Sequence, residues 1–361
     1  MLCTTLVRVT WTSSAPIDLH RADGGLGVPS SPGTEAPFIL GCTFGGTVVA
    51  LGSDRLSGSD SASSHLRVGD EVFGFVQDGD ARQAGFQEYV TVPAWRVSKL
   101  PAGWGMREAV TVPCNLVTAF HTLTADLGLA LPWPRPEGWA PPDGAGDKVV
   151  LVWGAASGVG MYVLQVLRYW GYGNVVAVAS AKHHDMLKGL GARVCFDYRR
   201  EGVVEEVLAY VEGVEGAGGP RVPFIVDCIG SVEGTLRPLT KIAEAGSKVA
   251  VMMPVIRIHA GKDQASELES DISKVLPEDW KKGVEVKATR TFFYMKNEFF
   301  KNHLQPEIVP ALMEQGVIQP NKQRVVEGKT MLERAQTALD LLRDQAVSGE
   351  KLVWRVAEDD A

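Results

Sequence analysis

The segment KVVLVWGAASGVGMYVLQVLRYWG, residues 148–171, constrains the fold more than any other part of the chain. It begins with an apolar run typical of a buried strand, continues through small residues and ends in a helical pattern of apolar residues. Gly154, Gly158 and Gly160 lie where the strand gives way to the helix. Glycines at this place permit a tight turn and let the amides of a helix N-terminus approach a pyrophosphate. The pattern predicts a dinucleotide-binding turn, and a turn that only packs the helix against a sheet is the alternative.

The segments after this turn alternate between strand and helix patterns. The strand-like runs are NVVAVAS, RVCFDY, VPFIVDCIG and KVAVMMP, and amphipathic stretches separate them. Such alternation predicts a doubly wound parallel sheet. Before residue 115 the chain instead shows short β-branched and aromatic runs divided by Gly, Asp and Pro, which predict a small barrel or sandwich. A chain of 361 residues is long enough for two such domains, and the fold class is therefore α/β.

The remaining segments are predicted as connectors and terminal elements. NLVTAFHTLTADLGLA has helical spacing, and the five prolines of LPWPRPEGWAPPDGAGDK then end the helix. The serine-rich stretch 53–67 is expected to be an exposed loop at a hairpin tip, without chemistry of its own. The tail contains two more helical stretches and ends in the strand-like KLVWRV.

Composition excludes several classes of function. Apolar residues make up 45% of the chain and charged residues 22%, as in soluble globular proteins, and a net charge of −7 argues against binding to nucleic acid. We find neither an apolar run of about 20 residues nor a secretory signal, so we expect a cytoplasmic protein without membrane contact. The cysteines are odd in number and scattered, which predicts reduced thiols rather than a disulfide framework or a metal clip. They are Cys3, Cys42, Cys114, Cys195 and Cys228.

The end of the second predicted strand indicates the cofactor. An NAD site would carry an acidic residue there, about 20 residues after the glycine turn, to bind the ribose 2′-hydroxyl. This chain instead has Ser180 and Lys182, whose hydroxyl and positive charge suit the 2′-phosphate of NADP. Tyr198, one strand further on, is placed to flank the adenosine. These residues predict NADPH, and the alternative for Lys182 is a solvated residue that starts a helix.

Seven segments in order resemble the medium-chain dehydrogenase/reductase superfamily. They are GCTFGGTVVALGSD, VGDEVFGF, GFQEYVTVP, LVWGAASGVG, LGARVCFDYR, VDCIG and SGEKLV. The resemblance runs from Leu6 to Val356 and is strongest to the quinone-oxidoreductase-like branch, in particular to fungal enoyl reductases that serve polyketide synthases in trans. It implies a GroES-like β-rich catalytic domain of residues 1–114 and 295–361 and a Rossmann NADP-binding domain of residues 115–294.

The resemblance also implies a set of site residues. Thr118 would approach the nicotinamide, together with the backbone at Met252 and Met253. The aromatic residues Phe292, Phe293 and Tyr294 would line the substrate, unless they are ordinary core packing. Together with the residues of the glycine turn and of the second strand end, the expected cofactor contacts are Asp18, Gly154, Ala156, Ser157, Gly158, Val159, Gly160, Ser180, Lys182, Tyr198, Met252, Met253, Ser348 and Lys351, of which the resemblance implies that the last two would close over the cofactor.

The same resemblance raises the question of a zinc ion. A catalytic zinc in this superfamily would require a cysteine near Ala15, a histidine near Cys42 and a cysteine near Cys114, and only the last is present. The cysteines of a structural zinc lobe are missing as well. One ligand of three cannot hold a tetrahedral site, so we expect no metal and a packing role for Cys42 and Cys114.

These expectations favour one reaction. Reduction of a ketone depends strongly on a Lewis acid, whereas hydride addition to the β-carbon of an α,β-unsaturated thioester or ketone needs only hydrogen-bond donors for the enolate. His20 stands where related enoyl reductases have lysine, and a histidine can deliver or relay the α-proton, or it can simply bind the cofactor. We therefore expect a zinc-independent NADPH enoyl reductase that acts with a polyketide synthase or its acyl carrier domain in secondary metabolism. The alternatives are an NADPH quinone or enone reductase for free small molecules and a non-catalytic NADPH-binding protein.

Overall fold

The computed structural model describes residues 4–24, 26, 38–52, 66–76, 80–214 and 219–357. The chain packs as two compact units. Unit 1 comprises Met1–Val117, Ala260–Ala265 and Phe292–Ala361, and unit 2 comprises Thr118–His259 and Ser266–Thr291. Most of the serine-rich stretch, residues 53–65, lies outside the described residues. The domain boundaries implied by the family resemblance stay a prediction.

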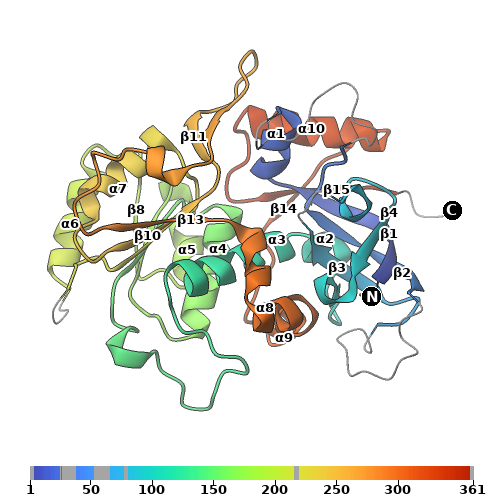
Figure 1. The fold of residues 1–361 in the computed structure, drawn as a ribbon, viewed down its shortest axis with the longest axis horizontal. Coiled ribbons are helices and arrows are strands. Elements are labelled where there is room, and N and C mark those ends of the chain that lie inside the picture. The colour runs from blue at the N-terminus through green and yellow to red at the C-terminus, as the bar shows by residue number, and fades with distance from the viewer. Residues whose placement is uncertain are drawn as a thin grey trace. The chain divides into compact units, whose positions relative to one another are not determined.

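Unit 1 is built on a seven-stranded sheet (Figure 1). Its strand order is β14-β15-β1-β2-β3-β5, and β4 pairs with β1 off this path. All pairs are antiparallel except β14 with β15. The strands are β1 (Thr4–Ser14), β2 (Thr43–Leu51), β3 (Glu71–Phe75), β4 (Tyr89–Pro93), β5 (Ser98–Lys99), β14 (Gln323–Val325) and β15 (Lys351–Arg355).

The helices of unit 1 lie mostly in the C-terminal part of its sequence. They are α1 (Pro16–Ala22), α2 (Met106–Ala109), α8 (Glu298–His303), α9 (Val309–Glu314) and α10 (Met331–Arg343), with the 3-10 turns η3 (Ala81–Gln83) and η4 (Ala94–Arg96) and the π-helical η11 (Leu304–Ile308). The helix α3 (Pro113–His121) and the turn η10 (Thr291–Lys296) each begin in one unit and end in the other.

The C-terminal strand completes the core of unit 1. In the pairing of β15 with β1, Trp11 is opposite Arg355 and Ser14 is opposite Leu352. Trp354 is fully buried, its ring lies 4.6 Å from that of Phe86, and its indole donates a hydrogen bond of 2.9 Å to Ser14. Val7 and Val9, at alternate positions of β1, face the same core.

Unit 2 contains a parallel six-stranded sheet in the order β13-β10-β9-β6-β7-β8. The strands β6 (Val150–Trp153) and β7 (Val175–Val178) are buried along their whole length, as expected when helices cover both faces. The other strands are β8 (Val194–Phe196), β9 (Phe224–Asp227), β10 (Lys248–Met252) and β13 (Glu285–Thr289), and β11 (Val255–Ile258) pairs with β12 (Glu267–Glu269) as a separate hairpin. Together the two sheets confirm the expected fold class.

The helices of unit 2 connect these strands. They are α4 (Gly158–Tyr169), α5 (His184–Leu190), α6 (Val203–Glu212) and α7 (Arg237–Ile242), with the shorter turns η5 (Thr122–Asp126), η6 (Pro142–Gly144), η7 (Ala181–His183), η8 (Val232–Leu236) and η9 (Ile272–Lys274). Every helix among the described residues is too short or too polar to cross a membrane.

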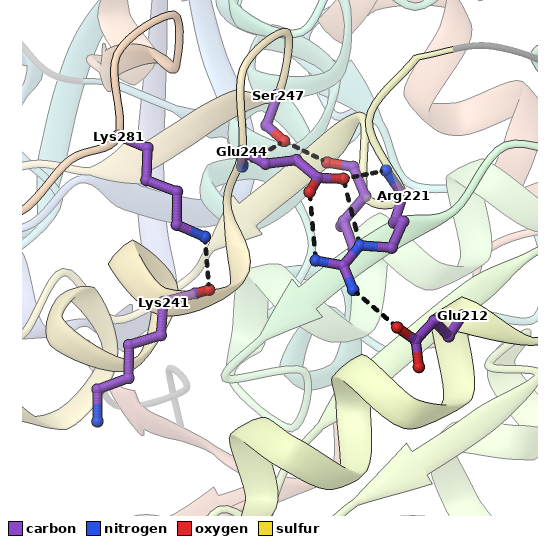
Figure 2. A network of polar contacts seen from close by, with 7 residues as sticks. Glu212, Arg221, Lys241, Glu244, Ser247 and Lys281 are labelled. Atoms are coloured by element: carbon purple, nitrogen blue, oxygen red, sulfur yellow. Dashed lines mark hydrogen bonds and ion pairs between the residues drawn. The ribbon is translucent and has the colours of Figure 1, made fainter.

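A network of ion pairs and hydrogen bonds connects the segments before β9 and β10 at the amino edge of this sheet (Figure 2). The guanidinium of Arg221 lies 3.2 Å from Glu244 and 3.6 Å from Glu212 at the end of α6. Ser247, just before β10, donates to the carbonyl of Val222 just before β9. The network is therefore structural, because ligands of parallel sheets bind at the opposite, carboxyl edge.

In unit 1, the buried amide of Gln305 supports the end of β3. Its Oε1 accepts from the Phe75 amide at 2.6 Å, and its Nε2 donates to the Phe75 carbonyl at 3.1 Å and to the Tyr294 hydroxyl at 2.9 Å. The side chain thus takes the place of a neighbouring strand.

We predict that Gln305→Ala lowers the free energy of unfolding by about 2–4 kcal/mol, because it leaves buried backbone groups of Phe75 without their partner. Urea unfolding measures the effect. The substitution Gln315→Ala, at an exposed glutamine of the same unit, should cost far less, and equal costs for both would contradict the assignment.

Candidate active site

The topology of unit 2 brings several loops to one edge of its sheet. Since the strands are parallel, the residues that follow β6, β7, β9 and β10 all leave at the carboxyl edge. From β6 the chain proceeds to β7 and β8 on one side, whereas β9, β10 and β13 lie on the other. The order thus reverses between β6 and β9, and open α/β sheets bind their ligands at such a point.

The predicted glycine turn lies at this point. Gly154 follows β6 with a φ of +76°, a conformation that favours glycine. The Ser157 hydroxyl caps α4 by accepting a hydrogen bond of 3.1 Å from the Gly160 amide. A Cβ on Gly160 would lie 2.6 Å from the carbonyl oxygen of Ala155, so only glycine allows this close packing. The turn residues 156–159 are half-buried, and they present the N-terminus of a 12-residue helix, which suits a pyrophosphate.

Asp227 at the end of β9 organises the neighbouring loop. This fully buried carboxylate accepts hydrogen bonds from the amides of Ile229 (3.0 Å) and Gly230 (3.1 Å) and from the hydroxyl of Thr235 (2.7 Å). Burial raises the pKa of Asp227 to about 6 despite these bonds. Sequence reasoning quoted VDCIG only as part of a family pattern. An acidic residue that ends an apolar strand before a glycine is the signal it missed.

Thr118, expected beside the nicotinamide, makes a polar contact within unit 2. It is buried on α3, and its hydroxyl lies 2.8 Å from that of Thr291. Further along, Thr289 on β13 donates a hydrogen bond of 2.7 Å to Asp126 at the end of η5. Burial raises the pKa of Asp126 to about 6. Thr291, Thr289 and Asp126 were not predicted, because their partners are far away in the sequence.

Met252 and Met253 lie at the same carboxyl edge of the sheet as the glycine turn. Met252 ends β10 opposite Thr289 of β13, and the amide of Met253 donates to the Thr289 carbonyl at 3.3 Å. Both methionines are half-buried. The structure thus brings the glycine turn, the loop after β9 and the two methionines together at the carboxyl edge.

Arg199, which was not predicted, lies beside two of the residues expected at the adenosine, Ser180 and Tyr198. The hydroxyl of Ser180, after β7, accepts a hydrogen bond from Arg199 Nη1. The Arg199 guanidinium lies 5.0 Å from the ring centre of Tyr198, which is 46% exposed. Lys182 is exposed in η7. Sequence reasoning missed Arg199, although a basic residue directly after FDY in the family pattern was a usable signal.

In unit 1, two residues expected to contact the cofactor, Asp18 and Lys351, act electrostatically on the thiols of Cys42 and Cys114. Asp18 is fully buried on α1 and accepts a hydrogen bond of 2.8 Å from the Ala15 amide. Burial raises the pKa of Asp18, and the buried cation of Lys351 opposes this effect. The Sγ atoms of Cys42 and Cys114 lie 3.6 Å apart, and both thiols respond to the charges of Asp18 and Lys351.

The other predicted residues of unit 1 differ in exposure. His20 is buried on α1, and Ser348 is exposed in the loop before β15. Phe292 and Phe293 are half-buried, with ring centres 4.7 Å apart. Tyr294 is only 2% exposed and packs in the interior near Phe75, and burial raises its pKa to about 12. Its expected contact with substrate stays a prediction.

Comparison with known proteins identifies the family. The model named Alcohol dehydrogenase GroES-like domain matches residues 4–102, and the model named Zinc-binding dehydrogenase matches residues 158–257. The trans-enoyl reductase tazE of Aspergillus terreus is 30% identical over 246 residues, which cover 68% of this chain and 76% of that protein. The chain belongs to the medium-chain dehydrogenase/reductase superfamily.

Other members of this superfamily resemble the chain over a greater length. The lovastatin nonaketide synthase enoyl reductase component lovC of Aspergillus terreus is 28% identical over 331 residues, 88% of this chain and 82% of that protein. An alcohol dehydrogenase superfamily structure from Novosphingobium aromaticivorans has a TM-score of 0.69 at 21% identity, covering 98% of this chain and 92% of its own. As a medium-chain dehydrogenase/reductase, the protein is an oxidoreductase that uses a nicotinamide dinucleotide.

The residues of this medium-chain dehydrogenase/reductase do not fit a catalytic zinc. At the three positions where the superfamily places its ligands, the chain has an alanine and two thiols, and the Cys42 thiol donates its hydrogen bond to Cys114. Among the residues that the structure describes, no three His, Cys, Asp or Glu side chains are grouped so that they could hold a metal.

The buried Asp227 carboxylate predicts a pH-dependent stability. Its pKa of about 6 in the folded protein lies above the usual 3.8, so its contribution is greatest in acid and is lost as the pH rises through 6. Relative to Asp227→Asn, which cannot titrate, the wild type should lose about 2–3 kcal/mol between pH 4 and pH 7. Denaturant unfolding at both pH values measures this difference. The control Asp147→Asn, at an exposed position, should show no such trend, and a constant difference for Asp227→Asn would refute the account.

Proposed function

We propose that the protein is an NADPH-dependent enoyl reductase that acts in trans with a polyketide synthase and needs no zinc. The observation that carries the proposal is that this medium-chain dehydrogenase/reductase has Ala15, Cys42 and Cys114 at the positions where zinc-dependent members have their metal ligands, and that the two thiols contact each other. Without a Lewis acid, reduction of a carbon–carbon double bond is the favoured hydride reaction. Relatives named trans-enoyl reductases support the same conclusion.

The residues of unit 2 fit NADPH. The glycine turn and the N-terminus of α4 would hold the pyrophosphate, as expected for Gly154, Ala156, Ser157, Gly158, Val159 and Gly160. Ser180, Lys182 and Tyr198, joined by Arg199, offer a hydroxyl, two cations and an aromatic face to the adenosine 2′-phosphate. Met252 and Met253 would provide backbone groups for the nicotinamide. In unit 1, we assign Asp18, Ser348 and Lys351 to the cofactor as well.

When bound, NADPH supplies the hydride that adds to the β-carbon of the unsaturated thioester. The side chains of this protein would orient the reactants and transfer the proton. Thr291 fixes the hydroxyl of Thr118, which we place beside the nicotinamide. His20, held in the buried part of α1, would deliver or relay a proton to the α-carbon. Hydrogen-bond donors that meet the enolate oxygen stabilise the transition state without any metal.

The substrate in this proposal is an enoyl chain tethered as a thioester to an acyl carrier domain. Phe292 and Phe293 form a half-buried aromatic pair suited to an apolar acyl chain. The Nζ atom of Lys296 lies 3.6 Å from the ring centre of Phe293 and orders that pair. Tyr294 would support the pair from the interior.

The cations near Ser180 predict a preference for NADPH over NADH. A charged contact to the 2′-phosphate is worth about 1.5–3 kcal/mol, so Arg199→Ala and Lys182→Ala should each lower the affinity ratio roughly tenfold or more. Titration with both nucleotides measures the ratio. The matched control is Arg200→Ala, because Arg200 forms an ion pair of 3.0 Å with Glu206 instead. Equal affinity of the wild type for both cofactors would contradict the assignment.

Isotope labelling tests the reaction itself. With an enoyl thioester and NADPH deuterated at the transferred position, deuterium should appear on the β-carbon of the product, and the α-proton should come from solvent. Mass spectrometry and NMR of the product locate the label. Deuterium on a carbinol carbon, with the double bond intact, would overturn the proposed function.

His20→Phe tests the proton donor separately. If His20 delivers or relays the α-proton, this variant should reduce turnover by roughly 10²–10⁴ while it still binds NADPH. Steady-state kinetics together with nucleotide titration separate the two effects. Full activity of the variant would remove His20 from the mechanism and leave the reaction standing.

A further inference from the structure

Cys42 and Cys114 are separated by 72 positions in the sequence, yet their sulfur atoms lie 3.6 Å apart in unit 1. Both are reduced. Cys42 is fully buried directly before β2, whereas Cys114, in the first turn of α3, keeps part of its surface exposed. A reagent can therefore reach Cys114 first, with a second thiol already in contact behind it.

The surroundings shift the pKa values of the two thiols in opposite directions. The Cys42 thiol donates its hydrogen bond to the sulfur of Cys114, which lowers the pKa of Cys114 and raises that of Cys42. The positive charges of Lys351 and Arg21 also lower the pKa of Cys114, while burial and the Asp18 carboxylate oppose them. A place in the first turn of a helix favours a thiolate as well. Cys114 is therefore the nucleophile of the pair, and Cys42 is the thiol placed to resolve it.

We propose that Cys42 and Cys114 form an oxidation site at which a peroxide produces a reversible disulfide. The Cys114 thiolate attacks one oxygen of the peroxide and breaks the O–O bond, which gives a sulfenic acid and releases hydroxide, or an alkoxide from an organic peroxide. The Cys42 sulfur then attacks the Cys114 sulfur, and the sulfenic oxygen leaves as water after it takes up the Cys42 proton. Both thiols are oxidised, and the one peroxide supplies the oxidising equivalents.

The other cysteines in the described part of the chain are poorer candidates. Burial raises the pKa of both Cys195 and Cys228, and the Cys195 thiol donates to the carbonyl of His184. A protonated thiol reacts slowly with peroxide because the thiolate is the nucleophile. Oxidation should therefore begin at Cys114.

The disulfide would form beside Asp18 and Lys351, whose charges both thiols sense. Since the proposed function assigns these two residues to the cofactor, we expect oxidised protein to lose activity reversibly, and this part of the inference rests on the proposed function. Formation of the bond does not depend on it.

The test is treatment of the whole protein with hydrogen peroxide, followed by intact mass measurement and peptide mapping. We expect the loss of two hydrogen atoms, a cross-link between the peptides of Cys42 and Cys114, and reversal by a dithiol reductant. Cys42→Ser should stop at a sulfenic acid on Cys114, which a dimedone-type probe captures. Cys114→Ser should give neither product. The matched controls Cys195→Ser and Cys228→Ser should still form the cross-link.

A second variant tests whether the charge of Lys351 makes Cys114 more reactive. Lys351→Met should slow capture of the Cys114 sulfenic acid severalfold in the Cys42→Ser background, because loss of this positive charge raises the pKa of Cys114 and so reduces the amount of thiolate. Lys322→Met, at an exposed lysine of the same unit, should leave the rate unchanged. A cross-link through other cysteines, or the absence of Cys114 sulfenic acid in Cys42→Ser, would overturn the proposal. If the reduced protein fails to reduce enoyl thioesters while the cross-link forms, only the proposed function fails.

Discussion

The parallel pairing of β6 with β9 determines where the chemistry of unit 2 can occur. In this register Trp153 lies beside Asp227, and the amide of Cys228 extends the ladder with a bond of 2.9 Å to the Trp153 carbonyl. The two loops that follow therefore leave the sheet together. Gly154 takes the left-handed conformation beside Ile229, and Asp227 holds the second loop through two amides. A shift of the register by one residue would separate the glycine turn from its neighbours.

The buried charges of unit 1 are difficult to explain by stability alone. Asp18 and Lys351 are both buried, and one oxygen of Asp18 has no hydrogen-bond partner among the described residues. Transfer of such groups from water is costly, and apolar residues of similar size often give equal or greater stability. A function for these charges is the simpler explanation. The proposed cofactor contacts and the thiol pair both provide one, since the same two charges act on Cys42 and Cys114.

Much of the fold was predictable because its signals are local. The change from apolar strand to glycine turn to amphipathic helix occupies residues 148–171 and defines β6 and α4. Alternating strand and helix patterns then imply a parallel sheet whatever the distant partners are. That the C-terminal segment joins the first domain was indicated only by the family resemblance. Ser180 and Tyr198 were named as candidate adenosine residues from their places after the second and third predicted strands, whereas Arg199 was overlooked.

The amino-acid sequence by itself determined most of the elements and the glycine turn, because these depend on residue types and on neighbours within a few turns of chain. Only the tertiary structure decided which distant side chains meet. Thr289 binds Asp126 across 163 positions, Gln305 supports Phe75 across 230, and Cys42 contacts Cys114 across 72. Such contacts follow from strand pairing and helix packing, which no short stretch of sequence specifies, because each arises when two separately encoded surfaces are buried against each other.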